Sequence, residues 1–331
     1  MNIVRKMNKA IRCLIMSLAC QAVAPGAWSQ QNSDDTEIHV LPVRDNIYML
    51  AGAGGNITLQ LGDEGVLIVD SQFARLSGKV LAAIRELSDL PIRYIINTHY
   101  HPDHVGGNME LRAAGSTIAG GNISMDIGNA GAGAQIIAHE NVLIRLSAQT
   151  AGDNVIPPEG WPTNPYFSAS KSLYFNGEGV KIIHAPAAHT DGDSMVYFRK
   201  SDVIVAGDIY VTTIYPYIDL EAGGSYQGLV NALNSLLDLM IPVYGQDDGT
   251  LVIPGHGRLS DIGDVLNYRE MLTIIGDRIK DMIKKGMTLK QVQAARPTRD
   301  YDPRWGAASG WWTTEMFVEA VYKSLSNRLE E

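Results

Sequence analysis

Short apolar runs and Gly-rich turns alternate along the first half of the chain. Residues 57–61 alternate apolar and polar side chains and residues 66–69 are wholly apolar, and both patterns are typical of β-strands. Residues 76–87 carry apolar side chains at helical spacing. The same reasoning predicts the other elements of this half: strands over 94–96 and 116–119, helices over 105–114 and 141–148, and a long surface loop over 151–165.

A second round of strands and helices follows that loop. Apolar and amphipathic patterns predict strands over 180–183, 194–198, 203–206 and 250–253 and helices over 226–240, 264–285, 289–295 and 313–325. Because strands and helices succeed one another without a strict βαβ rhythm, the pattern predicts an α/β fold in which sheets are covered by helices. The helices beyond residue 260 are predicted to pack on the same domain as an extension over 261–331.

The first 29 residues have the features of a secretory signal peptide. Four basic residues precede or begin a short apolar run, and Ala27 and Ser29 stand in the small-x-small arrangement of a signal-peptidase site. We therefore expect cleavage after Ser29 or nearby, and a periplasmic or secreted mature protein whose main domain covers 30–260. Two alternatives stay open: a disordered or membrane-lying N-terminal helix, and lipid attachment at Cys20.

Composition and charge exclude several classes of protein. The chain has 331 residues and is 45% hydrophobic, which excludes a disordered chain. A net charge of -9 argues against a nucleic-acid partner, and no apolar run after the signal peptide is long enough for an integral membrane span. Both cysteines, Cys13 and Cys20, would leave with the signal peptide. Any metal site in the mature chain must therefore use His, Asp and Glu.

The strongest chemical signal is a group of imidazoles directly after the predicted strand over 94–96. His99, His101 and His104 lie within six residues of one another, together with Asp103. His99 and His101 are two positions apart, so at an extended strand end their side chains point to the same side. Burying these groups without partners would be costly. The His-x-His-x-Asp-His pattern is therefore interpreted as metal-binding.

Three further residues follow predicted strands in the same way. His189, Asp208 and His256 each come after an apolar run, in a turn that contains glycine. Alone, each is an ordinary turn feature. Together with the motif they place His or Asp at the ends of four strands, where folds commonly carry binding groups. Five histidines and two aspartates are enough for two metal ions that share one ligand.

The order and separation of these residues resemble the metallo-β-lactamase superfamily, over roughly residues 38–259. The resemblance implies an αβ/βα sandwich of two mixed β-sheets flanked by helices, with metals at one edge. It also implies a role for each residue: His99, His101 and His189 hold the first metal, Asp103, His104 and His256 hold the second, and Asp208 bridges both.

Asp208 distinguishes the chain from the lactamase subclasses that use Cys at this position or lack a bridging carboxylate. The chain is more similar to the Asp-bridged hydrolases of the superfamily, such as hydroxyacylglutathione hydrolases and lactonases. Hydrolysis of β-lactams stays open. The ligand set suits two Zn²⁺ ions, although Mn²⁺ and Fe²⁺ also tolerate such ligands.

These residues predict an exported binuclear zinc hydrolase that acts on a small-molecule carbonyl substrate: an ester, thioester, lactone or β-lactam. A hydroxide shared by two metals would attack the carbonyl, and Asp103 would orient that hydroxide. Two alternatives remain, namely a phosphodiesterase or phosphotriesterase with the same metal site, and a non-catalytic metal-binding protein. Because Lys and Arg are sparse around the motifs, a neutral substrate is favoured.

Several residues beside the ligand set have two open interpretations. Asp70 either holds a ligand imidazole from behind or caps a turn, and Thr190 and Asp193 share this ambiguity. His139 and His184 are predicted to be structural.

Specificity is expected to lie in the loops over 122–135 and 151–165. Trp311 and Trp312 either wall a substrate pocket or pack elsewhere.

Overall fold

The computed structural model describes residues 36–117, 133–152, 155–241 and 249–327. The chain divides into two units, Met1–Gln31 and Asn32–Glu331, and all described residues belong to the second. The predicted signal peptide, both cysteines and most of the predicted specificity loop over 122–135 lie outside the described residues.

The first sheet brings the carboxyl ends of two buried strands to one edge. Its six strands lie in the order β1 (His39–Arg44), β2 (Ile47–Ala51), β3 (Ile57–Gly62), β4 (Gly65–Val69), β5 (Ile92–Ile96) and β6 (Gln135–Ile137). Strands β1 to β4 are antiparallel to one another, whereas β5 is parallel to both β4 and β6. The chain therefore leaves β4 and β5 on the same side of the sheet.

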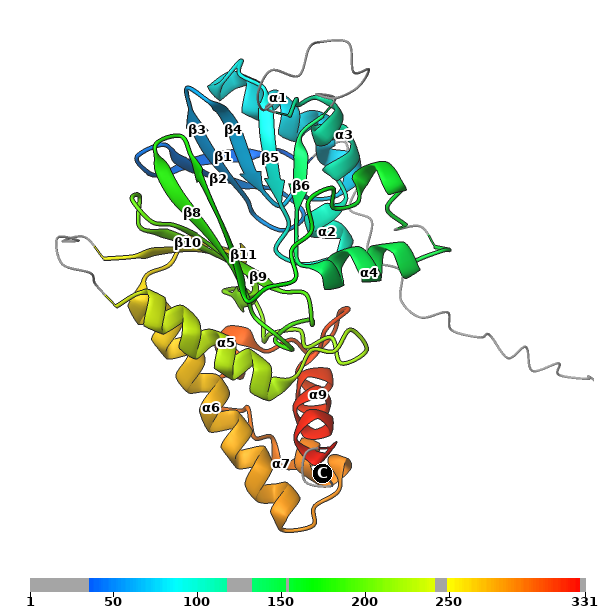
Figure 1. The fold of residues 1–331 in the computed structure, drawn as a ribbon. Helices are drawn as coiled ribbons and strands as arrows, with labels where there is room; N and C mark the ends of the chain where they lie inside the picture. Colours follow the sequence, from blue (N-terminus) through cyan, green and yellow to red (C-terminus); the bar gives the residue numbers. More distant parts are fainter. Residues whose placement is uncertain (1–35, 118–132, 153–154, 242–248, 328–331) are drawn as a thin grey trace, which may run out of the picture. The chain divides into compact units, whose positions relative to one another are not determined.

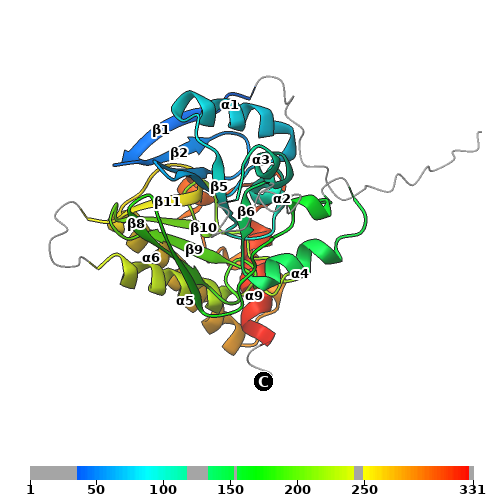
Figure 2. The same cartoon turned by 45° about the horizontal axis from the view of Figure 1, so that its top comes forward.

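The second sheet supplies the other strand ends. Its five strands lie in the order β11 (Leu251–His256), β10 (Val203–Val211), β9 (Ser194–Phe198), β8 (Glu178–His184) and β7 (Ser170–Phe175), and β10 and β11 are parallel. Apolar side chains of the two sheets meet in one core cluster, which includes Leu67, Val69 and Ile96 from the first sheet and Val196, Phe198 and Val205 from the second. Figure 2 shows the two sheets stacked face to face.

Helices cover the outer faces of both sheets (Figure 1). The first sheet is covered by α1 (Ser77–Leu87) and α3 (Asn108–Ala113), and α2 (Pro102–Val105) and α4 (Glu140–Ala148) lie beside its edge. The second sheet is covered by α5 (Tyr226–Leu239), α6 (Ile262–Lys284), α7 (Leu289–Ala295), α8 (Asp302–Trp305) and α9 (Thr314–Asn327). The predicted sandwich of two mixed sheets with C-terminal helices is confirmed.

The predicted helix over 105–114 is wrong in its bounds, since the structure has two helices, α2 and α3, separated at Gly106 and Gly107. A Cβ atom on Gly107 would lie 2.4 Å from the carbonyl oxygen of Ser71, and one on Gly106 2.6 Å from the nitrogen of Ala74. The chain therefore passes too close to the segment after β4 for any side chain at these positions. The break lets α2 turn the motif residues toward the sheet edge.

Two predicted strands also differ from the structure. The strand predicted over 203–206 extends to Val211, so Asp208 lies inside β10 rather than in a turn after it. Pairing with β11 is irregular on both sides of Gly207, whose φ is +53°. Of the strand predicted over 116–119, the described part forms only a single bridge from Ser116 to Gly133.

Candidate metal centre

All seven predicted ligands come together at the edge where β5, β10 and β11 end. His99 and His101 lie between β5 and α2, and Asp103 and His104 occupy the first turn of α2. His189 lies in the turn between β8 and β9, Asp208 in β10, and His256 is the last residue of β11. Three overlapping groups have ligand atoms within 4.8 Å of one another: His99, His101 and His189; His99, His104 and Asp208; and Asp103, His104 and His256.

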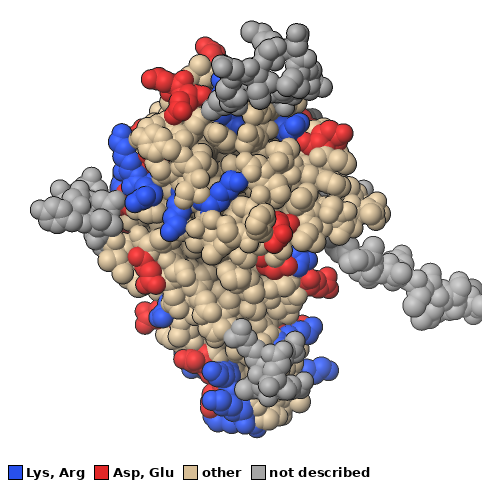
Figure 3. All heavy atoms as spheres, viewed as in Figure 1, with Lys and Arg blue, Asp and Glu red and all other residues tan. Residues whose placement is uncertain are grey.

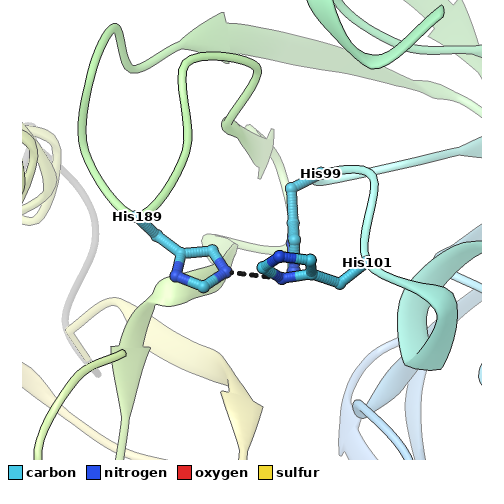
Figure 4. Close-up of side chains that lie close together, drawn as sticks. All are labelled: His99, His101 and His189. Carbon is cyan, nitrogen blue, oxygen red and sulfur yellow. Dashed lines mark hydrogen bonds between the residues drawn. The ribbon is translucent and has the colours of Figure 1, made fainter. Parts of the chain in front are cut away.

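The first group consists of imidazoles alone. Figure 4 shows His99, His101 and His189 turned toward one another, from two segments far apart in the sequence. The Nε2 atom of His189 lies 2.9 Å from Nδ1 of His101, and the His99 ring centroid is 4.9 Å from that of His101 and 4.6 Å from that of His189. Three nitrogens converging in this way match the ligand geometry that a divalent transition metal requires.

The second group joins carboxylates to imidazoles. His256 Nε2 lies 3.2 Å from Asp103 Oδ2 and 3.3 Å from His104 Nε2. Asp208 stands between the two groups: its Oδ1 is 3.4 Å from His104 Nε2, and its Oδ2 is 3.6 Å from His256 Nε2 and 3.9 Å from His189 Nε2. Asp208 is therefore placed to contact ions in both groups.

Hydrogen bonds behind the imidazoles leave their other nitrogens free to face the centre. His104 Nδ1 lies 2.8 Å from Asp70 Oδ2, and His189 Nδ1 lies 2.7 Å from the carbonyl oxygen of Tyr217. Since a carboxylate and a carbonyl only accept, these ring nitrogens carry the proton and donate. The Nε2 atoms of both rings therefore face the centre, where a metal ligand needs its nitrogen.

His99 follows the same arrangement through an intermediate hydroxyl. Thr98 Oγ1 donates to Asp70 Oδ2 at 2.7 Å and lies 3.0 Å from His99 Nδ1, from which it can accept. The backbone N–H of Thr98 also donates to Asp70, at 2.7 Å. Asp70, whose φ is +63°, thus supports two imidazoles of the centre.

Two buried atoms of the centre lack hydrogen-bond partners. His99 Nε2 and Asp208 Oδ1 are both buried, and neither has a hydrogen bond among the described residues. Leaving a buried acceptor unsatisfied costs about 1–3 kcal/mol. A divalent cation held between these residues would satisfy both atoms, so the residues fit the metal ions that the sequence predicts.

Charges within the site divide the imidazoles into two kinds. Although burial alone would lower both pKa values, the carboxylates of Asp208 and Asp103 raise the pKa of His104 well above its usual value and also raise that of His256. Burial, together with neighbouring imidazoles, lowers the pKa of His99 well below its usual value and that of His189 to about 4. Burial alone would raise the pKa of the two aspartates, but the imidazoles of His104 and His256 outweigh it. The pKa of Asp103 falls to about 2 and that of Asp208 well below its usual value. A metal ion would take the place of the extra proton on His104 and His256, because a ligand imidazole must be neutral.

Sequence reasoning missed Asp219, which supports the imidazole of His101. Asp219 Oδ2 lies 3.0 Å from His101 Nε2 and accepts a hydrogen bond from the Tyr100 hydroxyl at 2.8 Å. His101 therefore presents Nδ1 to the centre, opposite in sense to His189. One sequence feature could have indicated it. Asp219 follows the tyrosine-rich segment 210–217, which comes after a predicted strand.

The remaining predicted residues lie beside the centre rather than in it. Thr190 and Asp193 bond to each other, through the Thr190 hydroxyl at 2.6 Å and its backbone N–H at 2.8 Å. They therefore brace the turn that carries His189. His139 and His184 stack on each other with ring centroids 3.6 Å apart, and His139 is the N-cap of α4.

We expect Asp219→Ala to weaken metal binding by about 10- to 100-fold, because outer partners of ligand imidazoles typically have effects of that size. The reason is that His101 would lose the acceptor that fixes its tautomer. Competition with a chromophoric chelator measures the affinity. Glu221→Ala removes an exposed charge two residues away and serves as the control. Equal affinities in the two variants would contradict the role of Asp219.

We expect the stability of the protein to fall between pH 6.5 and pH 4 partly through His139. Burial and the neighbouring His184 lower the pKa of His139 to about 4, so the folded state binds fewer protons than the unfolded state in this range. This contribution is complete above pH 6.5 and is lost as the pH falls. His139→Asn keeps an N-cap acceptor without titrating. Urea denaturation at pH 7 and at pH 5 measures this effect. The unfolding free energy should fall less between the two pH values in the variant than in the wild type, by on the order of 1 kcal/mol. Equal losses of unfolding free energy in the variant and the wild type would contradict this role of His139.

Comparison with known proteins identifies a single family. The family model described as the metallo-beta-lactamase superfamily matches residues 51–256, which is more than half of the chain. The linear primary-alkylsulfatase of Pseudomonas sp. (strain ATCC 19151) is 25% identical over 254 residues, covering 68% of this chain and 46% of that protein. The metallo-beta-lactamase type 2 of Bacillus cereus is 21% identical over 210 residues, covering 63% of this chain and 69% of that protein.

Solved structures show the same fold. The stereoselective inverting sec-alkylsulfatase Pisa1 from Pseudomonas sp. aligns with a TM-score of 0.61 at 15% identity, over 86% of this chain and 50% of that one. The metallo-beta-lactamase from Pontibacter korlensis aligns with a TM-score of 0.53 at 14% identity, over 72% of this chain and 99% of that one. The chain thus spans about half the length of the alkylsulfatases that it matches.

Proposed function

The chain belongs to the metallo-beta-lactamase superfamily, whose members are metal-dependent hydrolases, and on this premise we propose that it is a binuclear zinc hydrolase of small-molecule carbonyl substrates. The substrates would be esters, thioesters, lactones or β-lactams. The observation that supports this proposal is the position of Asp208, whose two carboxylate oxygens face the imidazoles of both ligand groups.

Each ion would be held by one of the two groups. His99, His101 and His189 would hold one ion and Asp103, His104 and His256 the other, with Asp208 shared. Two bound divalent ions supply a hydroxide nucleophile at neutral pH and stabilise the negative charge that develops on the substrate oxygen.

The chain's own residues would orient the reactants. The pKa of Asp103, about 2, keeps its carboxylate ionised at neutral pH, so Oδ2 can accept a hydrogen bond from the attacking water and fix its direction. The side chains of His256 and His101 are 29% and 16% exposed, whereas those of His104 and His189 are fully buried. Substrate would therefore approach from the side of His256 and His101.

The surface and charge favour a small molecule over a nucleic acid. The net charge is -9, and on the face shown in Figure 3 acidic and basic side chains are interspersed, with broad uncharged areas between them. Nucleic-acid binding requires a continuous basic surface. None of the helices in the described ranges is long and apolar enough to cross a membrane.

A second candidate function is the hydrolysis of sulfate esters. The supporting observation is the alkylsulfatase of Pseudomonas sp., which is 25% identical over 68% of this chain. The same seven ligands would serve an attack on an alkyl sulfate, because the developing charge again lies on oxygen.

A turnover screen with zinc-loaded protein distinguishes the candidates. It compares nitrocefin, a lactone, a thioester, 4-nitrophenyl acetate, hexyl sulfate and bis(4-nitrophenyl) phosphate, with Asp208→Ala as the matched control. We expect Asp208-dependent turnover of a carbonyl substrate. Release of sulfate alone would favour the second candidate, and turnover of the phosphodiester alone would favour a phosphodiesterase. Two bound metals without any turnover would indicate a non-catalytic metal-binding protein.

A further inference from the structure

Three aromatic side chains form a continuous wall beside the metal centre. We define the aromatic wall as Tyr217, from the segment between β10 and α5, with Trp311 and Trp312, from the segment between α8 and α9. The Tyr217 ring centroid lies 5.5 Å from that of Trp311 and 4.8 Å from that of Trp312. In Figure 1 the orange-red segment that leads into α9 reaches from the C-terminal helices toward the second sheet.

The wall begins at the metal ligands themselves. The Tyr217 ring centroid lies 5.8 Å from that of His101 and 5.6 Å from that of His189. The Tyr217 carbonyl oxygen accepts the 2.7 Å hydrogen bond from His189 Nδ1, so the backbone of the wall is fixed to the centre. His101 is also one of the partly exposed ligands, on the side from which substrate would approach.

The outer member of the wall is open to solvent. Trp311 is 49% exposed, whereas Trp312 is only 7% exposed and belongs to the core beneath the second sheet. Trp312 therefore anchors the segment while Trp311 presents its ring. A single exposed aromatic is ordinary on a protein surface. One that continues a row of rings from a reactive centre offers a large, rigid apolar contact for a bound molecule.

We propose that the aromatic wall binds an apolar substituent of the substrate, an alkyl or aryl group that extends from the reacting bond over Tyr217 to Trp311. This inference rests on the proposed hydrolase function and specifies its substrate class. The C-terminal extension would then determine specificity as well as cover the sheet.

The charges around the wall favour an uncharged substituent over a charged one. Asp219, the acidic residue closest in sequence to Tyr217, is buried and already bonded to Tyr100 and His101. The guanidinium of Arg145, which lies 5.7 Å from the Tyr100 ring, donates two hydrogen bonds to the Asp191 carboxylate, both at 2.7 Å. A charged substituent would therefore gain no free partner from Asp219 or Arg145.

The test compares ligands that share one head group. Calorimetry of the zinc-loaded full chain measures the affinities of acetate and octanoate, whose carboxylates are the same and whose apolar parts differ. We expect octanoate to bind at least tenfold more tightly than acetate. In Trp311→Ala the ratio should fall to about two, and Trp311→Phe should restore most of it. Tyr174→Ala, which removes a 73% exposed aromatic ring from β7, should keep the wild-type ratio.

The outcomes separate this inference from the hydrolase proposal. An unchanged ratio in Trp311→Ala, with normal metal content, would overturn the inference even if esters are hydrolysed. A ratio that falls in Trp311→Ala would support the subsite even if no ester is hydrolysed. Tighter binding of acetylcholine than of its uncharged isostere 3,3-dimethylbutyl acetate would show a cation site instead, and would also overturn the inference.

Discussion

Asp208→Ala is expected to lower turnover by several powers of ten and to weaken the metal in the Asp103, His104 and His256 group most. The carboxylate of Asp208 lies within 3.4–3.9 Å of imidazoles from both ligand groups, so its removal takes a ligand from each ion at once. It also removes the negative charge that lies between the imidazoles of the two ligand groups. Since the nucleophile depends on both ions, turnover should fall further in Asp208→Ala than in a variant of a supporting residue such as Asp219.

Elemental analysis and steady-state kinetics of the same preparation measure both effects. His184→Ala is the matched control, because His184 is a partly buried imidazole near the centre that belongs to neither ligand group. Its Nε2 bonds to the carbonyl oxygen of Asp191 and its ring stacks on His139. We expect its loss to reduce stability by about 1 kcal/mol and to leave the metal content near normal. Equal metal loss in the two variants would show that the ligand assignment is wrong.

Removal of residues 261–331 is expected to abolish cooperative folding. Five large side chains of α6 and α9 are fully buried against α5 and the second sheet: Tyr268, Leu272, Ile275, Phe317 and Val321. Burying each such side chain contributes about 1.5–3 kcal/mol. Their sum is comparable to the whole stability of an ordinary domain, about 5–15 kcal/mol. A chain that ends at residue 260 would expose the apolar surface that these residues cover.

Circular dichroism melting and solubility of the shortened protein measure this effect. The control is the full chain cleaved at a protease site placed in the exposed segment between α8 and α9, which interrupts the backbone but keeps every helix. The cleaved control should melt cooperatively. A soluble 30–260 fragment with a sharp transition and bound metal would show that the extension is an independent addition.

Local patterns predicted the elements whose signals lie within one segment. The apolar run over 66–69 and the helical spacing over 76–87 correspond to β4 and α1, and the helix predicted over 289–295 has the bounds of α7. Burial of a whole strand gives the first pattern and burial of one helix face gives the second, so both are visible within a single segment. The edge strands β1 and β7, which are only partly buried, carry a weaker period and were not individually predicted.

The sequence by itself pointed to the seven residues that meet at the sheet edge, because each lies in a short motif within or directly after an apolar strand pattern. It also determined the absence of cysteine from the predicted mature chain, and with it the His and Asp character of the centre. Only the tertiary structure decided that Asp219 holds His101 and that Trp311 lies beside Tyr217. These pairs join residues about 100 positions apart, from segments without a common period. Their contacts depend on how the second sheet and the C-terminal helices pack, which no local pattern records.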